Sequence, residues 1–209
     1  MMYRVVLGKI SAIHEDMLPA PLRMLAPEGG RRAPWIAGRA LLLQALNLST
    51  LPEIIYGENG KPAFHGDIPL WFNISHSGDD IAVLVSDQGD VGCDLEILRP
   101  RRNWLRLAQA MFSAGEQAEL MSATEANQLA VFWQIWTRKE ALLKFAGQSV
   151  WSMADHDSAQ QNPPFTHQFM LDNASVLALC TSTPHTFSAS DLHFYNGEKA
   201  VEVASIHRF

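Results

Sequence analysis

Hydrophobic residues alternate with polar ones, or form short unbroken runs, in several segments of the chain, and both patterns are typical of β-strands. Short turns rich in Gly, Ser and Asp join three of these segments in the middle of the chain. Connections this short cannot cross over to a parallel neighbour, so we predict an antiparallel meander there. The predicted strands are residues 3–10, 70–75, 80–87, 91–98, 165–171, 175–182 and 201–206.

A helical period, with apolar residues three or four positions apart, replaces this alternation elsewhere. Pro34 is compatible with a helix only in its first turn. Ser113 and Glu116 have the spacing of a capping box, which predicts the start of a further helix. Gly147 follows the longest periodic segment and predicts its end. The predicted helices are residues 31–46, 105–112 and 125–146.

The order of these elements is strand, helix, strands, helices, strands, which predicts an α+β fold. The character of the chain changes near residue 103, and this is compatible with two similar halves, residues 1–103 and 104–209. The last three strands are predicted to form a second small sheet. Residues 57–62 are rich in Gly, Asn and Pro, which predicts a turn from which Lys61 projects.

The composition suits a folded protein that needs no covalent cross-links. The chain has 209 residues, of which 47% are hydrophobic, enough for a sizeable core. Cys93 and Cys180 are far apart and form no Cys-x-x-Cys motif, so neither a disulfide framework nor a zinc site is indicated, and a reducing, cytoplasmic setting is favoured. No apolar run reaches the length of a membrane span, and we predict a protein without a membrane segment.

The formal net charge of −6 argues against a general nucleic-acid-binding protein, because that task needs a broad positive field. The arginines are nevertheless clustered. Local basic patches on an acidic protein suit a compact anionic ligand or an acidic partner, although ordinary solvated charges remain an alternative. The two clusters are Arg31, Arg32 and Arg39, and Arg99, Arg101, Arg102 and Arg106.

Two acids, Asp94 and Glu96, lie two positions apart in the predicted strand 91–98. Their side chains therefore share one face, opposite the apolar one, about 7 Å apart at the backbone. Like charges this close repel unless they are solvated or bind a cation between them. Taken alone, the pattern favours a solvated face. If a metal is bound, oxygen ligands without His or Cys favour Mg²⁺.

The predicted helix 125–146 carries Trp136, Glu140 and Lys144 at four-residue spacing, on one stripe. An exposed Glu–Lys pair at this spacing is ordinary and contributes a few tenths of a kcal/mol. Here the surrounding segment is so apolar that little free surface remains. A charged pair in a largely buried helix needs a specific reason.

Four segments together resemble the Sfp-type 4′-phosphopantetheinyl transferases, and most closely the small holo-acyl-carrier-protein synthases of that group. They occur in the order and spacing of that family over about eighty residues, while the tail after residue 150 resembles nothing specific. The segments are GKPAF (60–64), FNISHS (72–77), VGCDLE (91–96) and FWQIWTRKEALLK (132–144).

The resemblance implies a monomeric, cytoplasmic pseudo-dimer of two similar α/β halves with the active site in the cleft between them. It implies transfer of the 4′-phosphopantetheine arm of coenzyme A to a serine of an apo-acyl or peptidyl carrier protein, as in fatty-acid synthesis, with release of 3′,5′-ADP. A coenzyme A or carrier-protein binding module without catalysis, and a Mg²⁺-dependent pyrophosphate hydrolase, are the alternatives.

The resemblance also implies roles for single residues. Asp94, Glu96 and Glu140 would coordinate Mg²⁺, Glu140 would also be the base for the carrier serine, and Lys144 would contact the phosphates. The residues implied to bind coenzyme A are Lys61, Pro62, Ser75, His76, Arg31 and Arg39.

Pro34 departs from the family pattern, because many relatives carry an arginine there that can hold the 3′-phosphate. Arg31, Arg32 or Arg39 would have to substitute. The carrier is expected to present an acidic helix, so its docking is predicted beside Trp104, where Arg99, Arg101, Arg102 and Arg106 cluster.

Overall fold

A computed structural model describes residues 2–158, 164–171, 174–195, 200–202 and 207–208. A five-stranded sheet has the order β10-β9-β1-β5-β4, a four-stranded sheet has the order β11-β7-β8-β6, and β2 and β3 form a separate hairpin. The strands are β1 (Tyr3–Lys9), β2 (Ile54–Tyr56), β3 (Pro62–Phe64), β4 (Trp71–Ser77), β5 (Asp80–Ser86), β6 (Val91–Ile97), β7 (Phe165–Leu171), β8 (Ser175–Thr181), β9 (Leu192–Tyr195), β10 (Ala200–Glu202) and β11 (His207–Arg208).

The helices are α1 (Ala20–Arg23), α2 (Arg32–Leu46), α3 (Trp104–Met111), α4 (Ala114–Ser122) and α5 (Glu125–Ala146), with 3₁₀ turns that include η3 (Gly29–Arg31) and η4 (Val150–Asp155). Pro34 lies in the first turn of α2, as predicted. Both bonds of the capping box form, with Glu116 N donating to Ser113 Oγ (3.2 Å) and Ser113 N donating to Glu116 Oε2 (2.8 Å). Gly147 ends α5 with a φ of 65°. The predicted α+β class is therefore confirmed.

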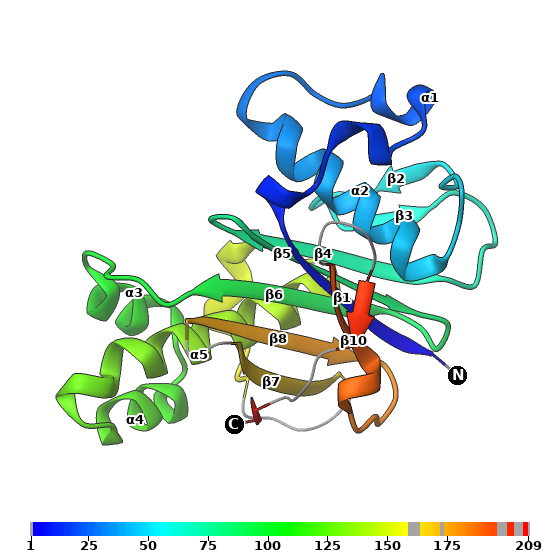
Figure 1. Ribbon diagram of the computed structural model, residues 1–209. Helices are drawn as coiled ribbons and strands as arrows, with labels where there is room; N and C mark the ends of the chain where they lie inside the picture. The colour runs from blue at the N-terminus through cyan, green and yellow to red at the C-terminus, as the bar shows by residue number, and fades with distance from the viewer. Residues whose placement is uncertain (1, 159–163, 172–173, 196–199, 203–206, 209) are drawn as a thin grey trace.

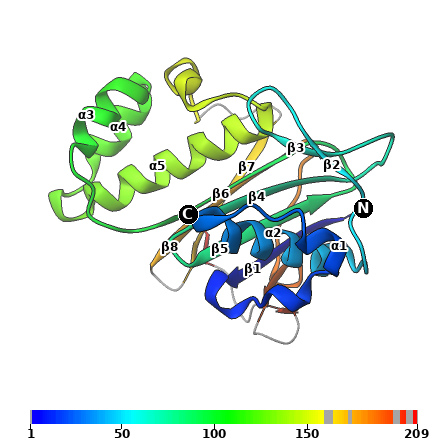
Figure 2. The same ribbon diagram turned by 90° about the horizontal axis from the view of Figure 1, so that it is seen from above.

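Figures 1 and 2 show α2 and α5 on opposite sides of the strands, so the order of layers is α2, five-stranded sheet, four-stranded sheet, α5. The five-stranded sheet is buried on both faces. In β1, Val6 packs toward α2, whereas Val5 and Leu7 pack toward the four-stranded sheet. Two buried faces explain why the sequence of β5 is an apolar run and not an alternation.

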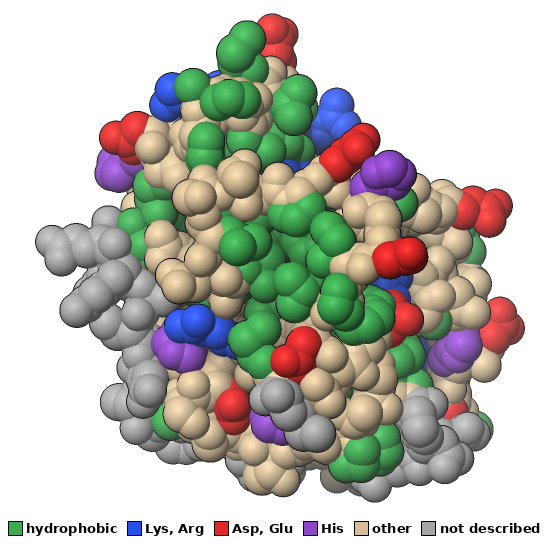
Figure 3. All heavy atoms as spheres, turned by 90° about the vertical axis from the view of Figure 1, so that its right-hand side faces the viewer, with side chains coloured by type: hydrophobic (Ala, Val, Ile, Leu, Met, Phe, Trp, Pro, Cys, Tyr) green, Lys and Arg blue, Asp and Glu red, His purple; other side chains and the backbone are tan. Residues whose placement is uncertain are grey.

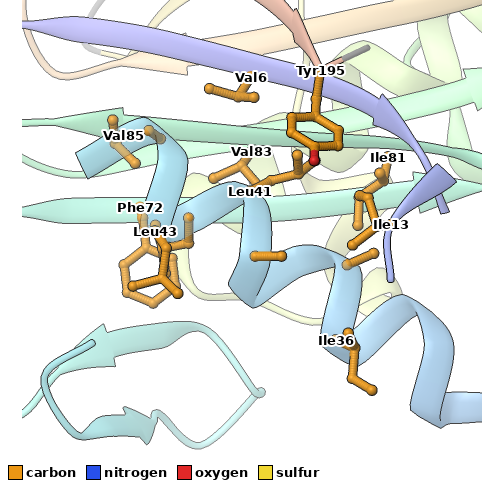
Figure 4. Close-up of a cluster of buried hydrophobic side chains, with 14 of the residues drawn as sticks. Val6, Ile13, Ile36, Leu41, Leu43, Phe72, Ile81, Val83, Val85 and Tyr195 are labelled. Carbon is orange, nitrogen blue, oxygen red and sulfur yellow. The ribbon is translucent and has the colours of Figure 1, made fainter. Parts of the chain in front are cut away.

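Figure 4 shows the cluster beneath α2, where Leu41 of the helix lies near Val83 and Leu43 lies beside Phe72. Full burial of one such side chain contributes roughly 1.5–3 kcal/mol to folding. A second cluster, which includes Phe132 of α5, packs α3 and α4 against α5. Of the helices in the described part of the chain, none combines the length and apolar character that crossing a membrane requires.

The predicted meander is only half correct. β4 and β5 pair antiparallel, but β6 joins the other sheet and pairs with β8, with Asp94 opposite Ala178. The second edge of β5 is taken by β1, with Val5 opposite Leu84, so no edge remains for β6. The solvated face that the strand pattern favours when taken alone is not what the structure shows, because α5 covers that side of β6 and leaves Asp94 only 4% exposed.

The end of the chain differs from prediction in its last predicted strand, and β9 was not predicted. The predicted strand 201–206 is described only at its start, where residues 200–202 form β10 in the five-stranded sheet and not in the second sheet. β10 joins the five-stranded sheet because β9 pairs parallel with β1 on one edge, and its other edge is free to pair with β10. Residues 203–206 lie outside the described residues. Each sheet thus contains strands from both sides of residue 103, and a boundary there stays a prediction.

A buried ion pair anchors α4 to α5. Lys139 Nζ lies 2.7 Å from Glu116 Oε2, and both side chains are completely buried. Lys139 also donates to the carbonyl oxygen of His156, and Ser158 N donates to Glu116 Oε1 at 2.8 Å. This network satisfies both charges and ties the segment after η4 to the two helices.

We predict that Glu116→Gln lowers the free energy of unfolding by roughly 3 kcal/mol, because it leaves the Lys139 ammonium buried without an anion. Urea denaturation measures the change. The matched control is Glu119→Gln, since Glu119 is 41% exposed in its pair with Arg138 and should contribute less than about 1 kcal/mol. Equal effects of the two substitutions would contradict the prediction.

Candidate active site

The candidate site lies where the edge strand of each sheet meets the other, between β4 and β6, under the C-terminal half of α5. β4 and β6 are the terminal strands of their sheets and share no backbone ladder. Side chains of β4 join them, and Ser75 is an example, because its Oγ accepts from Leu95 N at 3.1 Å. The site is therefore assembled from three elements that are distant in sequence.

Asp94 stands at the centre of this site. Its Oδ1 accepts from Lys144 Nζ at 2.6 Å and from Ser75 Oγ at 2.9 Å, and Lys144 Nζ also donates to Ser75 Oγ at 2.9 Å. Asp94 Oδ2 is buried and has no hydrogen-bond partner among the described residues. A buried carboxylate oxygen without a donor is costly, and a bound cation would satisfy it.

The predicted metal ligands influence one another electrostatically. Burial, followed by the charge of Asp94, raises the pKa of Glu140 to about 7, although Lys144 opposes the shift. Burial also raises the pKa of Glu96, with Asp94 adding to the effect. Within the described ranges, however, no three His, Cys, Asp or Glu side chains are already gathered closely enough to hold an ion.

The donor set still fits a hard divalent cation. The candidate ligands are carboxylate oxygens, which Mg²⁺ prefers. Mg²⁺ needs few protein carboxylates, because water and phosphate oxygens complete its coordination. Burial alone would lower the pKa of Lys144, but Asp94 more than offsets this, so the pKa is raised and the side chain carries a positive charge beside the acids. It stays a prediction that one metal ion is bound by Asp94, Glu96 and Glu140 together.

Gly92 allows α5 to approach β6. A methyl group at this position would lie 2.0 Å from the carbonyl oxygen of Ala141 and 2.6 Å from the amide nitrogen of Phe145, so only glycine fits. Ala141 follows Glu140 directly and precedes Lys144 by three positions. The close contact at Gly92 therefore sets the height of both charged side chains above Asp94.

Lys61 and Pro62 lie away from the carboxylates, on the β2–β3 hairpin. Lys61 Nζ contacts Asp90 Oδ1 and the carbonyl oxygen of Phe145, each at 2.5 Å, and so connects the hairpin to the end of α5. Both residues line a mainly apolar pocket of about 690 Å³, together with Tyr56 and Trp71 among others. The acids of the site do not line it. Figure 3 shows the side of the molecule toward which the hairpin lies, where hydrophobic side chains gather at the centre.

The structure places the remaining predicted ligand contacts separately. His76 follows Ser75 and is exposed overall. Partial burial of its ring, together with the charge of Lys144, lowers the pKa of His76 and favours the neutral imidazole. Arg39 is buried in α2, donates to Tyr56 Oη and stacks on Trp35 at 4.0 Å. Arg31 is exposed at the start of α2.

The second arginine cluster divides into two kinds. Arg101 stacks on Trp136 at 4.7 Å, and Arg99 Nη2 lies 3.6 Å from Glu96 Oε2, so both face the site. Arg102 lies just before α3 and Arg106 lies on it, and both are exposed. Leu105, between them in sequence, is 44% exposed. The exposed arginine pair gives the start of α3 a basic surface.

Comparison with known proteins decides the family. A sequence model described as the 4′-phosphopantetheinyl transferase superfamily matches residues 90–203, which contain β6 and α5 and thus Asp94, Glu96, Glu140 and Lys144. The chain belongs to the 4′-phosphopantetheinyl transferase superfamily. The resemblance predicted from four short motifs is confirmed.

Relatives within the superfamily match almost the whole chain. The chain is 53% identical over 193 residues to the 4′-phosphopantetheinyl transferase AcpT of Escherichia coli K12, which covers 92% of this chain and 97% of the relative. It is 54% identical over 187 residues to the AcpT of Salmonella typhimurium LT2, covering 90% and 96%. The 4′-phosphopantetheinyl transferase psf-1 of Bacillus pumilus is 32% identical over 144 residues, covering 60% and 59%.

The sequence did not point to Ser77 or Asn73. Ser77 Oγ donates to Glu96 Oε2 at 2.6 Å, and Asn73 Oδ1 accepts from Cys93 N at 3.1 Å. Together with Ser75 they form a polar stripe at every second position of β4. In a strand, such a stripe occupies one face, and its presence among apolar neighbours was the available signal.

We predict that Gly92→Ala displaces α5 from β6, lowers stability by about 1–3 kcal/mol and reduces the catalytic rate of phosphopantetheine transfer about 100-fold. Thermal unfolding and a transfer assay measure the two effects. Gly30→Ala is the matched control, because nothing lies within 4 Å of an added methyl group there. An active, stable Gly92→Ala variant would show that the close contact is dispensable.

Proposed function

We propose that this protein transfers the 4′-phosphopantetheine arm of coenzyme A to a serine of an apo-acyl or peptidyl carrier protein and releases 3′,5′-ADP, in a Mg²⁺-dependent reaction. The observation that carries the proposal is Asp94, a buried carboxylate with one oxygen bound by Lys144 and the other without a donor in the described part of the chain. Membership in the superfamily and the nearly full-length match to AcpT proteins support it.

In this proposal the serine oxygen of the carrier forms a bond to the β-phosphorus of coenzyme A, and the bond from that phosphorus to the bridging oxygen breaks. Negative charge then grows on the departing 3′,5′-ADP. A divalent cation held by Asp94, Glu96 and Glu140 would supply a Lewis acid for the phosphate oxygens.

The side chains of this chain have separate tasks in that reaction. Lys144 brings a positive charge to the phosphates from the same position in which it now contacts Asp94. Glu140 accepts the serine proton, directly or through a water molecule. Before a cation binds, burial raises the pKa of Glu140 to about 7, and a bound dication would lower it, so that the carboxylate is ionised when it accepts the proton.

We place the nucleotide end of coenzyme A toward the β2–β3 hairpin, with Lys61 and Pro62 as its contacts. The apolar pocket beside them supports this placement. Ser75, which contacts Asp94, and His76, the next residue of β4, contact the phosphates in the proposal. Of the three candidates for the 3′-phosphate, Arg31 is the most available, since Arg32 pairs with Glu15 and Arg39 is buried against Tyr56 and Trp35.

The first test incubates apo-carrier proteins with coenzyme A and Mg²⁺ and follows their mass. We expect the carrier serine to gain the phosphopantetheine arm, and Glu140→Ala to lower the rate at least about 100-fold, because the proposed base and a proposed metal ligand are lost together. Glu125→Ala, an exposed acid in the first turn of the same helix, is the matched control.

The same experiment separates the alternatives. Cleavage of coenzyme A without a modified acceptor would identify a hydrolase. An unchanged carrier and unchanged coenzyme A, over a panel of fatty-acid, polyketide and peptide-synthetase carriers, would identify a binding module. Full activity of Glu140→Ala would remove the assigned role of that residue.

The carrier is proposed to dock on the exposed basic surface of α3. We predict that Arg102→Glu combined with Arg106→Glu raises the KM for the carrier about tenfold, because an acidic helix meets reversed charges, whereas the KM for coenzyme A is unchanged. Steady-state kinetics at two salt concentrations measure this, and the effect should shrink at high salt. An unaltered carrier KM would exclude this surface.

A further inference from the structure

The connection between β4 and β6 consists of three side-chain contacts in place of a backbone ladder. Asn73 Oδ1, Ser75 Oγ and Ser77 Oγ accept from the backbone N–H groups of residues 93, 95 and 97, at 3.1, 3.1 and 3.3 Å. All three side chains are at most 5% exposed. We call these three contacts the polar seam.

Two of the three seam residues do more than hold β6. Ser75 and Ser77 each donate their hydroxyl proton to a carboxylate of β6, Ser75 to Asp94 Oδ1 at 2.9 Å and Ser77 to Glu96 Oε2 at 2.6 Å. Each hydroxyl thus fixes a backbone position and a carboxylate orientation together. Among the described residues, the Asn73 side chain makes only the backbone contact and none to an acid of the site.

Glu96 is subject to a second attraction. Arg99 Nη2 lies 3.6 Å from the same Oε2 atom that Ser77 contacts, and Arg99 is about half exposed. The bond from Ser77 is short, at 2.6 Å, whereas the ion pair is long and open to water, which weakens it. Removal of the hydroxyl would leave Arg99 as the dominant partner and turn the carboxylate toward solvent.

We propose that Ser77 is a positioning residue that holds the Glu96 carboxylate in its metal-binding orientation against Arg99. The inference rests on the proposed function, because it assumes that Glu96 is a Mg²⁺ ligand. Removal of a group that orients a metal ligand typically lowers the metal affinity 10- to 100-fold. Ser75 is less informative as a probe, since it also contacts Lys144 and is a proposed coenzyme A contact.

The experiment compares four forms of the full-length chain: wild type, Ser77→Ala, Ser77→Thr and Asn73→Ala. Isothermal titration calorimetry measures Mg²⁺ binding in the presence of coenzyme A and without carrier, and a transfer assay gives the Mg²⁺ concentration for half-maximal rate and the rate at saturating Mg²⁺. For Ser77→Ala we expect a 10- to 100-fold weaker Mg²⁺ affinity, with the saturated rate within about threefold of wild type.

The other variants separate positioning from simple loss of structure. Ser77→Thr keeps the hydroxyl and should retain wild-type Mg²⁺ affinity. Asn73→Ala removes a seam contact that touches no acid, so it should lower the melting temperature without changing Mg²⁺ affinity. In the double variant Ser77→Ala/Arg99→Gln, most of the lost affinity should return, because the competing cation is gone.

Two results would overturn the inference while the proposed function stands. One is unchanged Mg²⁺ affinity in Ser77→Ala when the wild type binds Mg²⁺ and modifies the carrier. The other is equal weakening by Asn73→Ala, which would show that the seam acts on stability alone. A wild type that neither binds Mg²⁺ nor modifies any carrier would instead refute the proposed function.

Discussion

The removal of Asp94 from water is the constraint on which the rest of this structure depends. A carboxylate that is only 4% exposed must find its compensation inside the protein. The compensation comes from two other layers, with the ammonium of Lys144 supplied by α5 and the hydroxyl of Ser75 supplied by β4. The charge is therefore tolerated only when both sheets and the helix are correctly packed. Within the described residues, Oδ2 of this carboxylate has no hydrogen-bond partner, and the proposed cation would bind there.

The polar seam explains how a fold with two sheets produces a site instead of one continuous sheet. Direct backbone pairing would bring β4 and β6 to about 4.8 Å and leave no room between them for side chains. Short polar side chains in place of that ladder separate the strands and line the boundary with hydroxyl and amide groups. The acids of β6 then lie beside donors from the other sheet. On the same face of β6 as Asp94, Gly92 lets α5 approach as near as backbone atoms allow.

Local signals in the sequence predicted local structure well. The bounds of α5, the turn at Pro34 and the capping box at Ser113 follow from periodicity and capping, which depend on neighbouring residues. The partner of β6 did not follow, because strand pairing is decided by contacts distant in sequence, and β1 competes for the edge of β5. Burial of Asp94 was missed for the same reason, since it depends on α5.

The candidate site was predicted unevenly. Asp94 was singled out by its like-charged neighbour Glu96 and Lys144 by its place in an apolar helix, and the structure brings Asp94 and Lys144 to 2.6 Å. Ser77 was missed because a serine in a strand is common and its role depends on Glu96 of another strand. Lys61 and Arg39 were named by resemblance, and in the structure their contacts are with Asp90 and Tyr56. That Lys61 and Arg39 bind coenzyme A stays a prediction.

The interleaving of the sheets has a consequence for how this protein could evolve or be divided. β9 lies beside β1 and β8 lies beside β6, so the late strands complete both sheets begun by the early ones. A fragment that stopped near residue 103 would expose two unpaired strand edges, which attract other chains and favour aggregation. Exchange of one half between homologous proteins would therefore have to preserve two strand junctions at once, whatever symmetry the halves share.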